Sequence, residues 1–156
     1  MGNELIAIIR IRGNVKVKST INDTMGMLNL TRTNHCTFYK TNVVLEGMLK
    51  KAKDYITFGT VNKETLMKVF KKRGRITGNR KITEEFLKEK KLDWDKLIDM
   101  FINDPKDVYN LGIKKVFRLS PPSKGFERKG IKLPFTVGGV LGNRKEKVND
   151  LIEKMA

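Results

Sequence analysis

The order of apolar segments in residues 1–60 constrains the fold more than any other feature of the sequence. Three short stretches, Leu5–Ile11, His35–Lys40 and Tyr55–Thr60, are rich in apolar, β-branched or aromatic residues, which is typical of strands in a sheet. In the two stretches between them, apolar residues recur at the spacing of an amphipathic helix. The first sixty residues are therefore expected to form a β-α-β-α-β unit.

Residues 61–156 form an extension of this unit. The pattern predicts helices that begin at Asn62, Thr83 and Asp93, a possible fourth strand at Val116–Leu119, and a last helix at residues 143–155. Asn143 and Glu146 have the spacing of a capping box at the start of that helix. At 156 residues the chain suits a single domain, in which residues 61–156 pack on a compact core of residues 1–60.

Most of the positive charge lies in this extension. The formal net charge is +16, but residues 1–60 carry only +5, from nine bases and four acids. Lys68–Lys81 contains seven Lys/Arg and no acid, and Lys114–Phe135 contains seven Lys/Arg and one acid. The irregular parts of these stretches form two basic loops, at residues 71–81 and 120–135. Basic loops suit the phosphates of a nucleic acid, whereas membrane surfaces are usually bound by basic amphipathic helices, so we expect no membrane partner.

Few residues in the sequence can support catalysis or metal binding. The single histidine and single cysteine, His35 and Cys36, are neighbours on one expected strand, so their side chains point to opposite faces of the sheet. No further pair completes a zinc site, and no second histidine can activate the thiol. We therefore expect no metal, no cofactor, no small-molecule substrate and no enzymatic activity. The alternative, an RNA-processing or RNA-modifying enzyme, would need a convergent site that the sequence does not contain.

The glycine-rich loop and the N-terminus require separate interpretation. Gly138–Arg144 lacks the signatures of a P-loop and of a dinucleotide-binding loop, so it either seats a nucleic-acid phosphate or is a plain loop.

The apolar run before Arg10 is too short to cross a bilayer, and signal-peptide features are missing. Myristoylation of Gly2 is disfavoured because Ile6 stands where Ser or Thr is required. One lone cysteine fits a reducing, intracellular compartment.

The chain resembles a known family over essentially its whole length. The matching segments are LIAIIRIRG from Leu5, LNLTRTNHCTFYK from Leu28, YITFGT from Tyr55, Lys72–Gly74, the loop at Gly78–Arg80, and GGVLGNR from Gly138 to Arg144. They are similar to large-subunit ribosomal protein thirty, whose eukaryotic counterpart is large-subunit ribosomal protein seven. The long basic N-terminal arm of the eukaryotic members is missing, so the chain looks archaeal.

The resemblance implies an α+β fold. Its core would hold a small three-stranded antiparallel sheet, similar to a partial ferredoxin-like fold, joined to a C-terminal extension of helices and basic loops. It also implies a non-catalytic, structural protein of the large (50S) ribosomal subunit that supports translation in the cytoplasm. The implied partners are large-subunit ribosomal RNA, close to where the 5S RNA docks, and other large-subunit ribosomal proteins.

Sixteen basic residues are the candidate RNA contacts. They lie in the core, in the two basic loops, just before the second of these loops and at the end of the glycine-rich loop, and are Arg10, Arg12, Lys16, Lys18, Arg32, Lys72, Arg73, Arg75, Arg80, Lys81, Arg118, Lys124, Arg128, Lys129, Lys132 and Arg144. Arginine can donate two parallel hydrogen bonds to a phosphate, and lysine acts as a point charge. We expect these side chains to neutralise closely spaced phosphates by shape and charge rather than to read bases.

Overall fold

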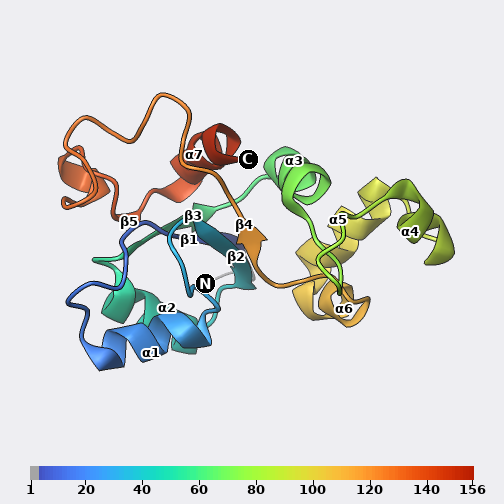
Figure 1. Cartoon of the computed structure of the whole chain (residues 1–156), viewed down its shortest axis with the longest axis horizontal. Coiled ribbons are helices and arrows are strands. Elements are labelled where there is room, and N and C mark those ends of the chain that lie inside the picture. Colours follow the sequence, from blue (N-terminus) through green and yellow to red (C-terminus); the bar gives the residue numbers. More distant parts are fainter. Residues whose placement is uncertain (1–3) are drawn as a thin grey trace.

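The fold is organised around one five-stranded sheet. A computed structural model describes residues 4–156 (Figure 1), so the interpretation of Gly2 lies outside the described residues. The strands are β1 (Leu5–Arg10), β2 (His35–Lys40), β3 (Ile56–Thr60), β4 (Phe117–Arg118) and β5 (Gly142–Asn143). Their order across the sheet is β4-β2-β1-β3-β5, and neighbours are antiparallel except for the parallel pair β3 and β5.

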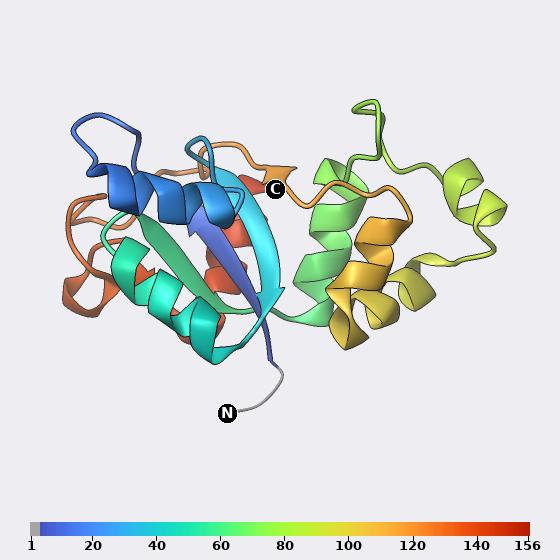
Figure 2. The same ribbon diagram turned by 90° about the horizontal axis from the view of Figure 1, so that it is seen from below.

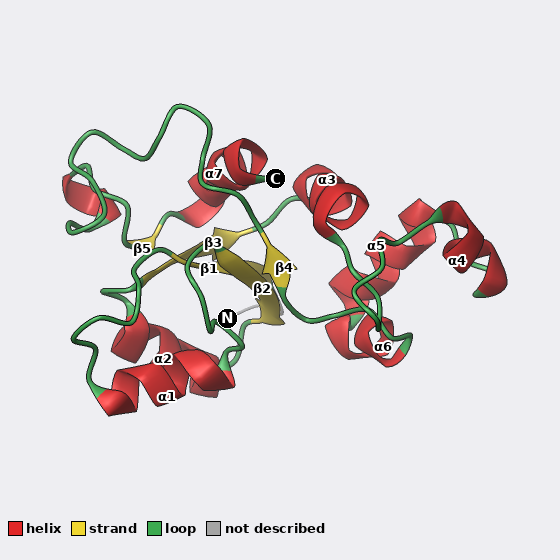
Figure 3. Cartoon of the chain, viewed as in Figure 1, coloured by secondary structure: helices red, strands yellow, loops and turns green. Residues whose placement is uncertain are grey.

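The extension contributes the two outer strands of this sheet. The α+β class is confirmed, but the expectation of three strands is wrong, because β4 and β5 widen the sheet at both of its edges (Figure 3). The fourth strand was expected at this place in the chain. The fifth was not, because two residues, Gly142 and Asn143, carry no periodic signal.

The central strand β1 is buried on both of its faces. Ile6 and Ile8 belong to one hydrophobic cluster, and Ala7 and Ile9 belong to another. A strand covered on both faces requires a nearly continuous apolar sequence, which explains the run of apolar residues that begins at Leu5. The two clusters therefore divide the molecule into two layers, one on each side of the sheet.

Two helices from the first sixty residues form the first layer. α1 (Ser19–Met27) and α2 (Val43–Ala52) lie side by side across one face of the sheet (Figure 2). They bury Met25 and Leu49 against the side chains of Ile6 and Ile8. The predicted β-α-β-α-β order is confirmed, and this layer is built by that unit alone.

Helices of the extension form the second layer. α3 (Lys63–Arg73) and α7 (Val148–Met155) cover the opposite face of the sheet (Figure 1). Phe38 of β2 and Phe70 of α3 each pack against Phe101 and Phe117, with ring centroids 4.9–5.8 Å apart. Such pairs contribute about 0.5–1.5 kcal/mol each beyond the burial of their area. Residues from both parts of the chain thus share one hydrophobic cluster.

Three further helices extend from the sheet on the far side of α3. α4 (Glu84–Glu89), α5 (Trp94–Asn103) and α6 (Pro105–Asn110) make up residues 82–110, here named the helical arm (Figure 1). α5 packs on α3 and buries Leu97 and Ile98. The helices predicted at Thr83 and Asp93 are confirmed, and Thr83 Oγ1 accepts a hydrogen bond from the Phe86 amide at 3.4 Å.

Helix α6 is not among the helices that the sequence predicted. Pro105 occupies the first turn of this helix, where its lack of an N–H group costs nothing. Asp104 caps the helix, since its side chain accepts a hydrogen bond from the Lys106 amide at 3.0 Å.

The last helix is shorter than expected. The pattern predicted residues 143–155, but a single 3-10 turn (Lys145–Lys147) follows β5, and α7 begins only at Val148. Lys145 has a φ of 52°, in the left-handed region, which interrupts the helix. Asn143 accepts a hydrogen bond from the Lys145 amide instead of forming a capping box with Glu146. No helix among residues 4–156 combines the length and the apolar character needed to cross a bilayer.

Candidate nucleic-acid interface

Segments that are far apart in sequence meet along one edge of the molecule. The end of β1 and the start of β2 both lie on this edge, and the Asn34 amide joins them by donating to the Arg10 carbonyl at 2.8 Å. The Leu119 amide, just after β4, donates to the Asn34 carbonyl at 3.1 Å, and the Ser120 amide donates to the Met155 carbonyl at the end of α7. We name residues 11–18, 29–34, 72–81 and 118–132 the basic edge; most of it follows the upper side of Figure 2.

Most of the predicted contact residues are exposed on this edge. Eleven of the sixteen have exposed side chains, namely Lys16, Lys18, Arg32, Lys72, Arg80, Lys81, Arg118, Lys124, Arg128, Lys129 and Lys132. Within the described part of the chain, none of these eleven forms an ion pair with a carboxylate. Their charge is therefore uncompensated in the protein, as a surface that meets closely spaced phosphates requires.

Arg12 is half-buried and held in place at the end of β1. Its guanidinium carbon lies 4.9 Å from the centroid of the Tyr55 ring, and it donates a hydrogen bond to the Asp54 carbonyl at 3.2 Å. Lys53 and Lys132 line a small hollow beside Asp54, so the second basic loop comes close to the start of β3. The geometry brings together two lysines, Lys53 and Lys132, that lie 79 residues apart in the sequence.

The first basic loop is a hydrogen-bonded hairpin at the end of α3. Arg75 and Lys81 pair in an antiparallel bridge, and the Ile76 amide donates to the Arg80 carbonyl at 2.9 Å. Gly78 has a φ of 83°, which is accessible to glycine without strain and lets the chain reverse at the tip. Arg73, the last residue of α3, is half-buried and donates to Ser120, which links the base of the hairpin to the segment after β4.

Arg10 does not belong to the RNA contacts that the sequence suggested. Only 1% of its surface is exposed, although it ends a strand next to exposed arginines. Its guanidinium donates to the carbonyls of Arg12 at 2.9 Å and of Leu30 at 2.7 Å, and to the side chain of Asn14. Burial lowers its pKa. We correct its assignment. Arg10 is a buried residue that joins residues 12–14 to Leu30 by hydrogen bonds, and it is not available to a phosphate.

Arg144 needs the same correction. It is 3% exposed and pairs through both terminal nitrogens with Glu127 of the second basic loop. Its Nε donates to Thr57 Oγ1 on β3 at 3.0 Å, and its guanidinium carbon lies 4.7 Å from the centroid of the Phe135 ring. Partial burial opposes the charge on Glu127, but the hydrogen bonds and attraction of Arg144 outweigh it and lower the Glu127 pKa. Arg144 thus fastens the second basic loop to the sheet.

The glycine-rich loop is also part of the packing. A side chain on Gly139 would place its Cβ 2.0 Å from the Leu133 carbonyl oxygen, so the two backbones touch there. Gly142 pairs with Thr57 of β3, and the Arg144 amide donates to the Phe58 carbonyl at 2.8 Å. These contacts explain why glycine is required at positions 139 and 142, and they already use the Arg144 amide, so no bound phosphate is needed to account for the loop.

The surroundings of His35 and Cys36 differ as the strand pattern predicted. Cys36 is fully buried in the second layer, and this burial raises the pKa of its thiol. His35 is half-exposed. No group of three or more His, Cys, Asp or Glu side chains within residues 4–156 is arranged to hold a metal ion.

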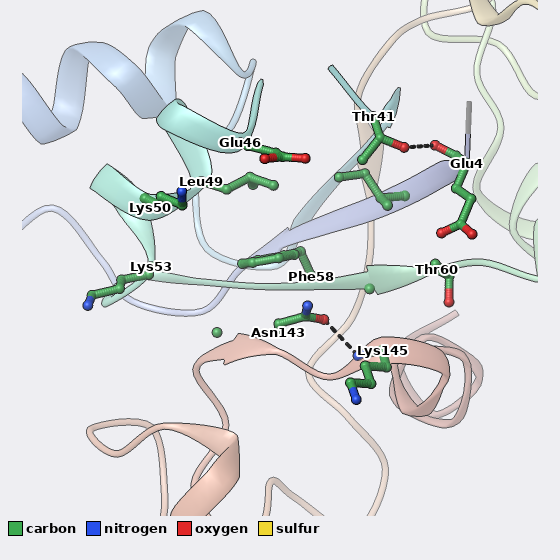
Figure 4. Close-up of a pocket in the computed structure, with 13 residues that line it drawn as sticks. Glu4, Thr41, Glu46, Leu49, Lys50, Lys53, Phe58, Thr60, Asn143 and Lys145 are labelled. Carbon is green, nitrogen blue, oxygen red and sulfur yellow. Dashed lines mark hydrogen bonds between the residues drawn. The ribbon is translucent and has the colours of Figure 1, made fainter. Parts of the chain in front are cut away.

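Three lysines that the sequence reasoning did not select line a hollow of about 580 Å³ between α2, β3 and β5. Leu49 and Phe58 form part of its apolar lining, and its charged lining combines Lys50, Lys53 and Lys145 with the carboxylates Glu4 and Glu46 (Figure 4). Lys53 also lines the smaller hollow near Lys132, so the two hollows adjoin each other between α2 and the second basic loop. The run Lys50–Lys53 contains three lysines. It was not selected from the sequence because it is shorter than the two basic loops.

Comparisons with known proteins agree on one family. Residues 6–56 match the family model described as ribosomal protein L30p/L7e. Proteins named large ribosomal subunit protein uL30 are similar over nearly the whole chain. The relative from Methanococcus maripaludis is 46% identical over 96% of this chain and 97% of its own length. The relative from Nanoarchaeum equitans is 46% identical over 95% and 96%, and that from Methanosphaera stadtmanae is 43% identical over 97% and 99%.

Proposed function

Because this chain belongs to the uL30 family of large ribosomal subunit proteins, we propose that its basic edge is the surface that binds large-subunit ribosomal RNA. Membership makes the protein a structural constituent of the large subunit, associated with its RNA and with other ribosomal proteins, and not an enzyme. The earlier alternative of an RNA-processing or RNA-modifying enzyme has no support from the relatives.

One observation carries the proposal about the basic edge. Eleven exposed cations from four separate stretches of sequence lie on it or beside it without a carboxylate partner in the described chain. Like charges that gather without partners repel one another, so the fold bears a cost that a polyanion would remove. Arg12, Arg73 and Arg75 are half-buried among them and can add contacts. Folded loops that present such charges favour recognition of RNA by shape and phosphate position.

The test compares two variants that lose the same charge at different places. R75Q/R80Q/K81Q removes three positive charges from the hairpin, and K88Q/K90Q/K106Q removes three from exposed positions on the helical arm. At about 0.1 M salt, we expect the hairpin variant to bind archaeal large-subunit RNA roughly 10- to 100-fold more weakly and the arm variant less than about threefold. Filter binding measures both, and thermal melts confirm that both fold. Equal losses would show that only net charge matters.

We also propose that the protein lies close to the 5S RNA. The support is the family to which the chain belongs rather than any contact within the chain. A photo-crosslinker placed at Lys81 or Lys129, assembled into archaeal large subunits, should label the 5S RNA or neighbouring large-subunit helices. Labelling confined to RNA remote from the 5S RNA would reject this placement.

We further propose that residues 1–60 and 61–156 form one domain. Leu5, Ala7 and Phe38 of the core share a cluster with Leu66 and Ile152 of the extension. A fragment of residues 1–60 would leave that face of the sheet uncovered, so we expect it to aggregate or remain unfolded when expressed alone. A folded, monomeric fragment would contradict this proposal.

A further inference from the structure

The single histidine of the chain lies among arginines at the basic edge. His35 pairs with Arg118 across β2 and β4, and residues paired in this way point to the same face of a sheet. The His35 amide donates to the Arg32 carbonyl at 3.3 Å, and the neighbouring Asn34 amide donates to the Arg10 carbonyl. Arg118 therefore lies on the same face of the sheet as the half-exposed imidazole, and the backbone bonds bring Arg32 and Arg10 close to His35 in the fold.

This environment disfavours a charged imidazole in the free protein. Burial lowers the pKa of His35, and Arg118, Arg32 and Arg10 lower it further by repulsion. Arg10 is buried and each of its three guanidinium nitrogens donates a hydrogen bond, but Arg32 and Arg118 are exposed. The only side-chain hydrogen bond that the structure gives the ring, within its described residues, joins Nδ1 to Thr31 Oγ1 at 3.4 Å. Within the described residues, the second ring nitrogen, Nε2, therefore has no side-chain hydrogen-bond partner and can donate an N–H to a ligand.

We propose that Arg32, His35 and Arg118 form one phosphate-binding cluster, and that His35 takes up a proton when an RNA phosphate docks on it. The phosphate would offset the two exposed guanidinium charges and accept a hydrogen bond from the imidazolium. This inference rests on the proposed function of the basic edge, but it assigns a proton-coupled contact to one place on it.

The sign of the coupling follows from linkage. A bound phosphate raises the His35 pKa above its value in the free protein, so binding is strongest below the free-protein pKa. The added affinity is lost as the pH rises through the bound-state pKa. A tenfold difference between the two limiting affinities corresponds to a difference of one pKa unit. We expect roughly tenfold tighter binding at the acidic limit of the titration than at pH 8.

The experiment measures affinity against pH for the full-length protein and transcribed archaeal large-subunit RNA at constant salt. The wild type should show the roughly tenfold change, and H35Q should be nearly flat over the same range. K106Q, which removes one exposed charge beside Thr41 at the other end of β2, should keep the full dependence. Titration calorimetry in two buffers of different ionisation enthalpy should show proton uptake by the wild type that H35Q loses.

An independent measurement uses the free protein. Because the chain has one histidine, its imidazole gives a single, assignable NMR titration. R118Q should raise the His35 pKa in the free protein by removing a repelling charge, and should also weaken RNA binding. Strong, salt-dependent RNA binding with equal pH profiles for wild type and H35Q would overturn this inference alone. Loss of salt-dependent binding altogether would instead reject the proposed function.

Discussion

The basic edge and the helical arm carry charge in different ways. On the basic edge, eleven exposed cations have no acidic partner among residues 4–156. On the arm, residues 82–110 contain eight acids and five bases, and Asp93 and Asp99 pair with lysines. Both regions belong to one chain and share one hydrophobic cluster. Net charge is therefore concentrated where RNA is proposed to bind, while the arm remains close to neutral.

The interior of the two regions differs as well. Beneath the basic edge, two buried arginines, Arg10 and Arg144, hold loops to the sheet through hydrogen bonds and one ion pair. The arm packs through the apolar residues Leu97, Ile98 and Phe101, and its polar ties to the rest of the molecule lie nearer the surface, namely the Lys63–Asp99 ion pair and hydrogen bonds that join Lys40 to Asn103 and Tyr109 to Phe38. Substitutions at buried polar groups should therefore affect stability at the edge far more than substitutions of surface charge on the arm.

The largest effect is expected from E127A, which leaves the buried Arg144 without its carboxylate. Breaking a buried ion pair from one side costs up to about 3–5 kcal/mol, and the partial exposure of Glu127 places our expectation near 3 kcal/mol. The melting temperature should fall by about 6–12 °C. E146A, which removes an exposed acid from the turn before α7, is the matched control and should change the melting temperature little.

The Glu127 carboxyl also gives the wild type a pH signature. Its pKa is lower in the folded protein than in the unfolded chain, so the pair stabilises the fold fully above the unfolded value of about 4.3. This stabilisation is lost as the pH falls through the lower folded value. The difference in melting temperature between wild type and E127A should therefore shrink on acidification below about pH 4. A constant difference down to pH 2 would contradict the role given to the pair.

A smaller effect is expected from R10M. Methionine retains an unbranched apolar chain but leaves the buried Leu30 carbonyl without its donor, which should cost about 2 kcal/mol. R32M, on the exposed side of the same edge, should change stability by less than about 0.5 kcal/mol and should weaken RNA binding instead. Urea denaturation and RNA titration together separate the two roles. Equal destabilisation by both variants would remove the distinction between buried and exposed arginines.

The smallest effect is expected on the arm. Lys63 and Asp99 form an ion pair of 2.6 Å between α3 and α5, with both side chains about half exposed. Such surface pairs contribute from zero to about 1 kcal/mol, so D99N should lower stability by no more than that and leave RNA affinity unchanged. A loss comparable to that of E127A would mean that the arm depends on charge as the edge does.

Periodic segments were predictable from the sequence because local pattern decides them. The three strands and two helices of residues 1–60 follow apolar spacing, and the helices near Thr83 and Asp93 follow capping and amphipathic signals. Strand β5 was not predictable, because Gly142 and Asn143 become a strand only by pairing with β3. Lys145, whose left-handed φ delays α7, packs its backbone against Gly59 of β3, which is also a tertiary contact.

The candidate site was predictable in composition but not in arrangement. A count of lysines and arginines found the two basic loops, yet Arg10 and Arg144 have the same local signal as exposed arginines. Their burial depends on partners such as Leu30 and Glu127, which lie 20 and 17 residues away in the sequence. The meeting of His35 with Arg118 likewise required the sheet.

The salt dependence of RNA binding tests the central claim most directly. If the basic edge engages about six to ten phosphates, the affinity of the wild-type protein for large-subunit RNA should fall by roughly 10³- to 10⁵-fold between 50 and 200 mM salt. The slope of log affinity against log salt should become shallower by about 2–3 in R75Q/R80Q/K81Q and stay unchanged in K88Q/K90Q/K106Q. A flat response of the wild type, or the same slope for both variants, would contradict the account.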